Sequence, residues 1–432
     1  MRVFLVIMVV ALYSLGGAFA QQTIPPLTEE LAVRLALDNS PLVAMSSAES
    51  GMARARLEAA RAEQKLQVSA NGLATVSTMP NAIQTAGVMP SALLTTRDRA
   101  AADLNLMVMV PLSTGGRLES SIAAAAELAG AGAARLDASR VQVAYEARMR
   151  LAQWQAAVAA LQVAQESSVT QEEQTRVAEQ LVNAGKVARF DLLRNQAARA
   201  ARQQAVARGE AEVATAQARM AEIVAGEVSS CGAPSQEIRP ALPEDLASFA
   251  SAQRPDLQAA QAELAAAEAA VQVRKASYQP QIYGVGMADL FSPASMGDST
   301  GISVGVVAGL PLVDGGRRRS EVSEAEQAVL RARASVQALE LQVRAEVAAA
   351  QARLAAARTN TQTAQAQVVA AEEGYRLAQV RYQAGKSIVV ESLDSLAALT
   401  EAKQNQVQVQ AELSMAFAEV YRAVGMAEAE GH

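Results

Sequence analysis

The chain has 432 residues, of which 51% are hydrophobic, but much of that fraction is alanine and only 3% of the residues are aromatic. Small side chains suit helices that pack closely together and exclude a thick globular core. The net charge is −6, with acids and bases interspersed, so the sequence lacks the basic surface that nucleic-acid binding needs and no nucleic-acid partner is expected.

The N-terminus predicts a secretory signal peptide over residues 1–20. Arg2 supplies a positive charge, residues 3–12 form an apolar segment too short to span a bilayer, and residues 18–20 read Ala-Phe-Ala, a cleavage pattern. The mature chain is expected to begin at Gln21. Because no cysteine follows the cut, a lipid anchor on an N-terminal cysteine is not expected.

Two helices are expected next. Thr28 is placed to cap the first helix, and Ser40 followed by Pro41 is placed to start the second, which runs to about Lys65. Proline at the first helical position is favourable because its missing N–H has no helical partner there.

The pattern then changes from helical to alternating. Apolar and polar residues alternate over 66–76 and again over 103–110, which indicates two strands that each have one apolar and one polar face. The two runs predict a hairpin that is ended by Pro111 and the Gly115-Gly116 pair.

A helix much longer than those of globular proteins follows. Residues 117–183 contain no proline and carry apolar residues at helical spacing, which predicts a helix on the order of 100 Å long. A second helix returns from Asp191 to about position 224, and a linker follows it. Helices of globular proteins average about 11–12 residues, so the length of the helix over 117–183 indicates an elongated architecture.

The second half of the sequence repeats the first. The tripeptide Ala-Gly-Lys occurs at 184–186 and 384–386, and Pro-Leu-x-x-Gly-Gly-Arg occurs at 111–117 and 311–317, both with an offset of 200 residues. The predicted organisation is therefore a first repeat over 21–225, a linker over 226–245, a second repeat over 246–425 and a tail over 426–432.

The second repeat is expected to follow the same plan. A helix should run from Pro255 to about Ser277, strands should follow at 281–287 and 302–310, and two long helices should meet at Gly385. A stripe of valines and leucine in the first long helix is spaced as in coiled coils, and ordinary helix packing is the preferred interpretation. Its members are Val329, Val336, Val343, Val347 and Leu354.

Acids open the helices that follow both Ala-Gly-Lys turns. Asp191 follows the first turn, and Glu391 and Asp394 follow the second, three residues apart and so on one face of the helix. Two interpretations remain open: the acids suit a helix start, where the dipole favours negative charge, or they serve a site. Ser387 is four residues before Glu391, one too many for a capping box.

Catalytic chemistry is poorly supported. The only histidine is His432 and the only cysteine is Cys231, which excludes a His-based triad, a Cys-His pair and a His/Cys zinc site. The Gly-Gly pairs lack the Gly-Lys-Ser/Thr ending of a phosphate loop. We therefore expect no enzyme, no cofactor and no metal.

Half-polar strands in a secreted chain point to a membrane barrel. Such strands cross a bilayer only in a closed barrel, and four strands are fewer than the usual minimum of about eight. Several chains must therefore contribute, so an oligomer is expected.

The residues resemble the TolC-type outer-membrane efflux channels, over nearly all of the mature chain. The most specific part is 381–397, which is similar to the family pattern of aromatic-x-Ala/Val-Gly, a short bridge, an acid and a second acid three residues on. The resemblance implies a mainly α fold with a β-barrel portion: a homotrimer with a twelve-stranded barrel in outer-membrane lipid, continued by a helical barrel across the periplasm of a Gram-negative bacterium.

The resemblance also implies roles for residues at the two turns. At the periplasmic gate, Glu391 and Asp394 match the acids that ring the closed entrance. Tyr382 and Asp191 match a pair that links neighbouring hairpins. Two departures are clear, since Ser387 stands where some members have an arginine and Glu391 replaces an aspartate. The tips where a periplasmic adaptor docks match Ala184, Gly185, Lys186, Ala384, Gly385 and Lys386.

Three functions are compatible with this sequence. The main hypothesis is a passive exit duct for substrates expelled by an inner-membrane pump through a periplasmic adaptor. The first alternative is the outer-membrane channel of a type I protein secretion system, which the partner pump would distinguish. The second, a periplasmic coiled-coil scaffold or adaptor, explains the helices but not the four strands, and recovery from soluble periplasm would favour it.

Overall fold

A computed structural model describes residues 26–76, 82–84, 93–95, 100–232, 245–291, 301–384 and 386–427. The expected signal peptide, part of the expected linker, Gly385 and most of the expected tail lie outside these residues. Within them, no helix has the length and apolar character needed to cross a membrane.

Two pairs of long helices dominate the fold. Helix α3 (Arg117–Asn183) is followed by α4 (Arg189–Val224), and α7 (Arg317–Gln383) is followed by α8 (Val389–Val424). Every boundary in the second pair lies 200 residues beyond its counterpart in the first. The ends of the long helices in the two repeats therefore correspond residue for residue.

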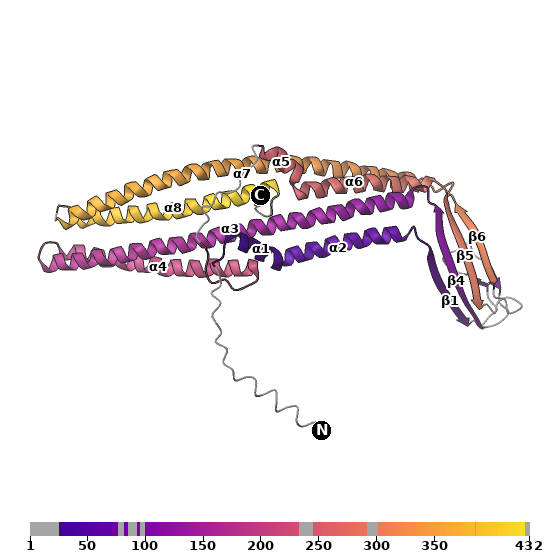
Figure 1. Cartoon of the computed structure of the whole chain (residues 1–432), viewed down its shortest axis with the longest axis horizontal. Helices are drawn as coiled ribbons and strands as arrows, with labels where there is room; N and C mark the ends of the chain where they lie inside the picture. The colour runs from indigo at the N-terminus through magenta and orange to yellow at the C-terminus, as the bar shows by residue number, and fades with distance from the viewer. Residues whose placement is uncertain are drawn as a thin grey trace, which may run out of the picture.

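The helices form an elongated layer with the sheet at one end (Figure 1). Near the far end α7, α8, α3 and α4 lie side by side in that order, because α8 contacts both α7 and α3. Nearer the sheet α4 and α8 have ended, and α2 (Pro41–Ala62) and α6 (Pro255–Lys275) take their places against α3 and α7.

The shorter helices begin where side chains can cap them. Thr28 accepts a hydrogen bond from the Leu31 amide at the start of α1 (Glu29–Asn39), and Ser40 accepts one from Val43 at the start of α2, as the sequence predicts. Helices α2 and α6 end a few residues earlier than expected. Helix α5 (Leu246–Gln253) was not predicted, and its first turn is capped by the Asp245 carboxylate.

Four strands form one antiparallel sheet in the order β1-β4-β5-β6. Its strands are β1 (Gln67–Val76), β4 (Ala100–Ser113), β5 (Gln281–Phe291) and β6 (Gly301–Gly309), and a separate pair joins β2 (Ala82–Gln84) to β3 (Leu93–Thr95). The first hairpin ends between Pro111 and the Gly115-Gly116 pair, the residues expected to end it. Strand β4 continues to Ser113, and an irregularity in its pairing with β5 after Pro111 accommodates the missing N–H.

The sheet is open at both edges. Every residue of β6 is exposed, and the side chains of Ile302 and Val304 are 84% and 85% exposed. Strand β1 forms the other edge, where Val68 is 60% exposed. Unpaired strand edges with exposed apolar side chains are surfaces on which another chain can pair.

The Gly-Gly pairs turn the chain from strand to helix in the same way in both halves. Gly116 and Gly316 have φ values of 84° and 92°, which side chains with a Cβ rarely adopt. The residue before each pair caps the helix: the Thr114 hydroxyl accepts from the Leu118 amide, and the Asp314 carboxylate accepts from the Arg318 amide.

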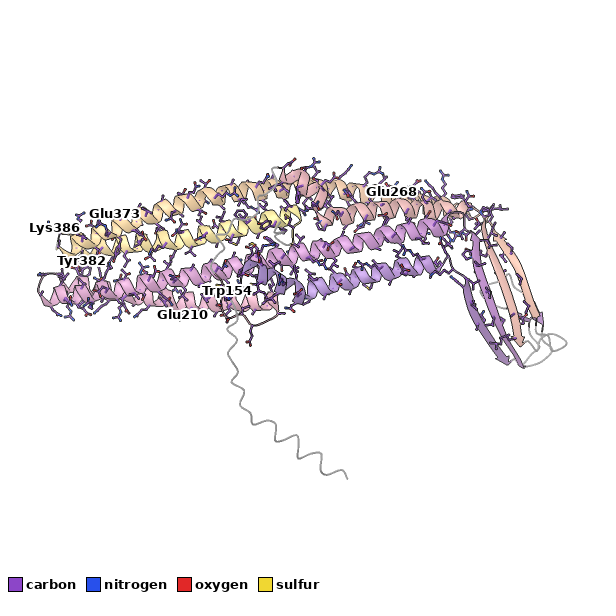
Figure 2. All side chains as sticks on the ribbon, viewed as in Figure 1. Trp154, Glu210, Glu268, Glu373, Tyr382 and Lys386 are labelled. Atoms are coloured by element: carbon purple, nitrogen blue, oxygen red, sulfur yellow. The ribbon has the colours of Figure 1, made fainter. Side chains whose placement is uncertain are left out.

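The apolar core lies near the middle of the long helices. The predicted stripe of α7 packs inward here, and Val343, Val347 and Leu354 are buried against Val420 and Val424 of α8. In the first repeat Trp154 is buried in a second cluster with Met220 and Leu27. Figure 2 shows Trp154 in this middle region.

A buried arginine joins three helices beside this core. Arg254, at the start of α6 and 8% exposed, contacts Asp256 and the α7 residue Glu346 at 2.6 Å each, and donates to the Ala423 carbonyl at 3.3 Å. Burial raises the pKa of both carboxyls, but the hydrogen bonds and charge of Arg254 outweigh burial and hold the pKa of Asp256 and of Glu346 below its ordinary value.

Replacing Arg254 should remove a stabilisation that depends on pH. Arg254→Met leaves two partly buried carboxylates without their cation, so we expect a loss of about 3 kcal/mol at pH 7. Lowered carboxyl pKa values stabilise the fold above about pH 4, and this stabilisation disappears as pH falls through the lowered values. The melting temperatures of variant and wild type, followed by circular dichroism, should therefore converge between pH 7 and pH 3.

A control separates this effect from the loss of any arginine. Arg353 pairs with Glu419 at 2.8 Å, but its side chain is 63% exposed, so Arg353→Met should change stability by less than about 1 kcal/mol. An equal deficit of Arg254→Met at both pH values would contradict the proposed role of the carboxylates.

Candidate functional site

The candidate site lies at the end of the molecule away from the sheet, where both helical hairpins turn (Figure 1). In each turn the lysine amide donates to a carbonyl five residues earlier, Lys186 to Leu181 and Lys386 to Arg381, both at 2.9 Å. Gly185 has φ +69°, so the first turn needs a residue that tolerates the left-handed conformation.

The residues predicted for docking are exposed wherever the structure describes them. Ala184, Gly185, Lys186, Ala384 and Lys386 are all exposed, and Figure 2 shows Lys386 at the end of the α7/α8 hairpin. Gly385 lies outside the described residues.

Exposed apolar side chains surround these turns. These side chains were not predicted from the sequence. Phe190 is 62% exposed and Ile388 is 69% exposed, and Leu193 and Val380 lie nearby in sequence and are also exposed. Large apolar side chains at a tip without a covering element favour contact with another surface.

Glu391 is held by two groups of its own chain. Its carboxylate lies 3.1 Å from the Arg381 guanidinium and accepts a hydrogen bond from the Ser387 hydroxyl. The serine that falls outside capping-box spacing thus still contacts this acid. Arg381 was missed, although an arginine ten residues before an acid across a tight turn is a usable signal.

Asp394 differs from Glu391. It lies one turn further along α8, is exposed, and forms no ion pair with the described residues. The structure therefore places the two acids on neighbouring turns but compensates the charge of only one.

The Tyr382 hydroxyl lies within reach of the charge of Asp191. Burial, together with the negative charge of Asp191, raises the pKa of the Tyr382 hydroxyl. Tyr382 is 6% exposed, and its hydroxyl has no hydrogen-bond partner among the described residues. Figure 2 shows this tyrosine at the hairpin end.

A polar seam joins the two hairpins below the tips. We give this name to the buried hydrogen bonds between α3 and α8: Ser167 to Thr400 at 3.0 Å and Gln174 to Ser392 at 3.3 Å. Lys403 of α8 adds an ion pair with Glu166 at 3.3 Å. This seam was not predicted, because polar residues on long amphipathic helices are usually solvated.

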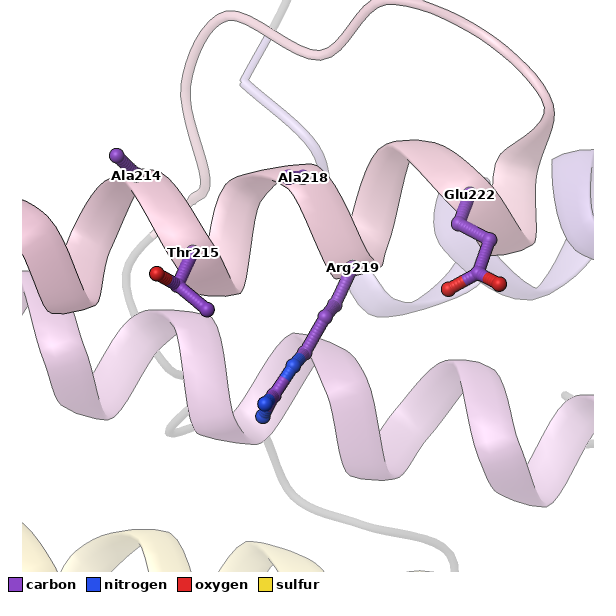
Figure 3. A pocket seen from close by; sticks show the side chains of 5 residues that line it. All are labelled: Ala214, Thr215, Ala218, Arg219 and Glu222. Atoms are coloured by element: carbon purple, nitrogen blue, oxygen red, sulfur yellow. The ribbon is translucent and has the colours of Figure 1, made fainter.

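A surface hollow on α4 offers no comparable chemistry (Figure 3). It measures about 560 Å³ and is lined by Ala214, Thr215, Ala218, Arg219 and Glu222, all of one helix. Ligand sites normally draw polar groups together from several elements. No group of three or more metal-ligating side chains occurs in the described part of the chain.

Two equal helical hairpins joined to one open antiparallel sheet are the plan of an outer-membrane channel protein. The sequence profile of the family described as outer membrane efflux protein matches residues 32–226 and 246–426. The chain belongs to this family, which confirms the resemblance to TolC-type outer-membrane efflux channels. Members of this family are channels and not enzymes.

Solved structures share the fold over almost the whole chain. A membrane protein from Pseudomonas aeruginosa is 21% identical with a TM-score of 0.80, over 94% of this chain and 92% of that one. The outer membrane protein VceC from Vibrio cholerae is 18% identical with a TM-score of 0.77, over 92% and 96%. The open state of the Neisseria gonorrhoeae MtrE outer membrane channel is 19% identical with a TM-score of 0.78, over 92% and 89%. A comparison with curated protein sequences found no match.

Proposed function

We propose that three copies of this chain form a passive exit duct through the outer membrane, fed by an inner-membrane pump through a periplasmic adaptor. The observation that carries the proposal is the open sheet, with β6 exposed along its whole length at one edge and β1 at the other. Pairing β6 of one copy with β1 of the next closes a barrel without free edges. Three copies of four strands give twelve, enough for a closed barrel.

The helices of the three copies close into a tube in the same way as the sheets. In one chain α4 and α7 lie at the two borders of the four-helix layer, so α7 of one copy meets α4 of the next when the sheet closes. Around the tube the order α4, α3, α8, α7 then repeats three times. In this arrangement each hairpin contacts the next through a long helix of one repeat and a shorter helix of the other. This holds for the α3/α8 contact within a chain and for the α7/α4 contact between chains.

At the periplasmic end the tips dock the adaptor and carry the gate. Support for docking comes from the exposed turns and from Phe190 and Ile388 beside them. Support for the gate comes from Glu391 and Asp394, which three copies bring around one axis. At ~5 Å and an effective dielectric of ~20, two such carboxylates repel by about 3 kcal/mol, and Arg381 offsets part of this for Glu391.

One experiment tests the duct directly. The mature protein, purified in mild detergent, should have the mass of three chains by light scattering and should conduct ions in a planar bilayer. A monodisperse monomer would contradict the proposal, and so would a trimer that conducts ions at no applied voltage.

The acids should contribute to the ion preference of this pore. In the Glu391→Ala, Asp394→Ala double variant, six carboxylates are lost from the entrance, so the permeability should shift toward anions and block by multivalent cations from the periplasmic side should weaken. Reversal potentials in asymmetric salt measure the shift. If preference and block were unchanged, the acids would serve only their helix start, where each contributes ~0.3–1 kcal/mol.

A further inference from the structure

The two hairpins carry opposite charges at one equivalent position. Arg194 in the second turn of α4 and Asp394 in the second turn of α8 are 200 residues apart, the offset that relates all boundaries of these helices. At the other tip positions where both copies are charged the sign is kept, as with Lys186 and Lys386 or Asp191 and Glu391.

Hydrogen bonds show that the two positions lie at one level along the molecule. Gln171 of α3 donates to Asn195 of α4 at 3.1 Å, and Gln174, three residues along α3, donates to Ser392 of α8 at 3.3 Å. Because α4 and α8 both run antiparallel to α3, the α8 position level with Asn195 lies three residues after Ser392, at 395. Arg194 is therefore level with Asp394 to within about one helical turn.

Neither charge is compensated by an ion pair among the described residues. The Arg194 guanidinium lies over the Phe190 ring, 5.1 Å from its centroid, which orients the cation without neutralising it. Asp394 is exposed and unpaired in the same part of the chain. In contrast Arg199, five residues along α4, is paired with Glu172 of its own hairpin at 3.3 Å.

We propose that Arg194 is a selectivity-determining residue of the entrance, and that three copies of Arg194 alternate with three copies of Asp394 around it. The inference rests on the proposed trimer, in which α4 and α8 alternate around the axis and equivalent positions face the same way. Alternating charges cancel at a distance, so this level of the pore does not act as an acidic ring. The net preference is then set by the balance of Arg194 against Asp394, with Glu391 already paired to Arg381.

Charge exchange tests this arrangement in planar bilayers. Arg194→Ala should raise the cation-to-anion permeability ratio of the trimer about tenfold and Asp394→Ala should lower it by a similar factor, because a charged ring changes local ion concentrations to about this extent. The exchanged variant, Arg194→Asp with Asp394→Arg, keeps the alternation and should restore the wild-type ratio. Arg199→Ala is the control and should leave the ratio unchanged.

The outcomes separate this inference from the duct itself. Unchanged ratios in both single variants of a conducting trimer would overturn the alternating ring and leave the duct intact, and so would an Asp394→Ala effect without an Arg194→Ala effect. An exchanged variant that stays shifted would also overturn it. Wild-type protein that neither trimerises nor conducts would overturn the duct and the inference together.

Discussion

Gly185→Trp should abolish export while the trimer still forms and inserts. The turn at Gly185 is exposed and no atom lies within 4 Å of the place where a Cβ would stand, so a large side chain projects outward into the proposed docking surface. The φ of +69° adds a strain of about 1–2 kcal/mol, which is small against a typical unfolding free energy of about 5–15 kcal/mol. The expected result is a loss of at least about 100-fold in transport with unchanged oligomer on native gels.

Two controls distinguish docking from strain. Gly185→Asn keeps a residue that tolerates the left-handed conformation and should export almost normally. Gly185→Ala carries the strain without the bulk and should also remain active. Normal export by Gly185→Trp would rule out the first tip as a docking site, and poor export by Gly185→Ala would assign the effect to the turn conformation.

Val304→Arg should prevent assembly in the membrane. Val304 is 85% exposed in β6, between Ile302 and Val306 on the apolar face of the strand. An arginine on the lipid-facing side costs about 2–4 kcal/mol near the bilayer midplane, so three copies cost about 6–12 kcal/mol. The variant should be missing from outer-membrane fractions.

The adjacent residue supplies a matched control. Ser303 lies on the opposite face of the same strand, because successive side chains alternate, and Ser303→Arg should therefore insert as a trimer. Equal insertion of both variants would show that the Val304 face does not meet lipid.

Periodicity predicted most of the fold because each long element obeys one strong pattern. The bounds of α3 are as expected, since Gly116 and the Ala-Gly-Lys turn stand at its two ends. Strand β4 runs past Pro111 because the neighbouring strand tolerates an irregularity there, which depends on a partner 170 residues away. Helix α5 was missed because eight residues carry too little periodicity, although Asp245 is a cap of the usual kind.

The candidate site was only partly predictable. The acids and the glycine turns stand out in the sequence, but Arg381 gains meaning only when the turn brings it to Glu391. The buried partners of Gln174 lie about 200 residues away in the other repeat, and no local pattern pairs them. Contacts between elements, rather than the elements themselves, are what the sequence leaves undetermined.

The helices are held together by different interactions in the middle of the molecule and at the polar seam near the turns. Around Val343 and Trp154 the helices are held by apolar burial, which water cannot replace. Toward the tips Ser167, Gln174 and Thr400 hold them by hydrogen bonds, each with a net strength of about 0.5–1.5 kcal/mol because water can take the place of either partner. The two hairpins are therefore expected to separate more easily from each other near their turns than around Val343 and Trp154.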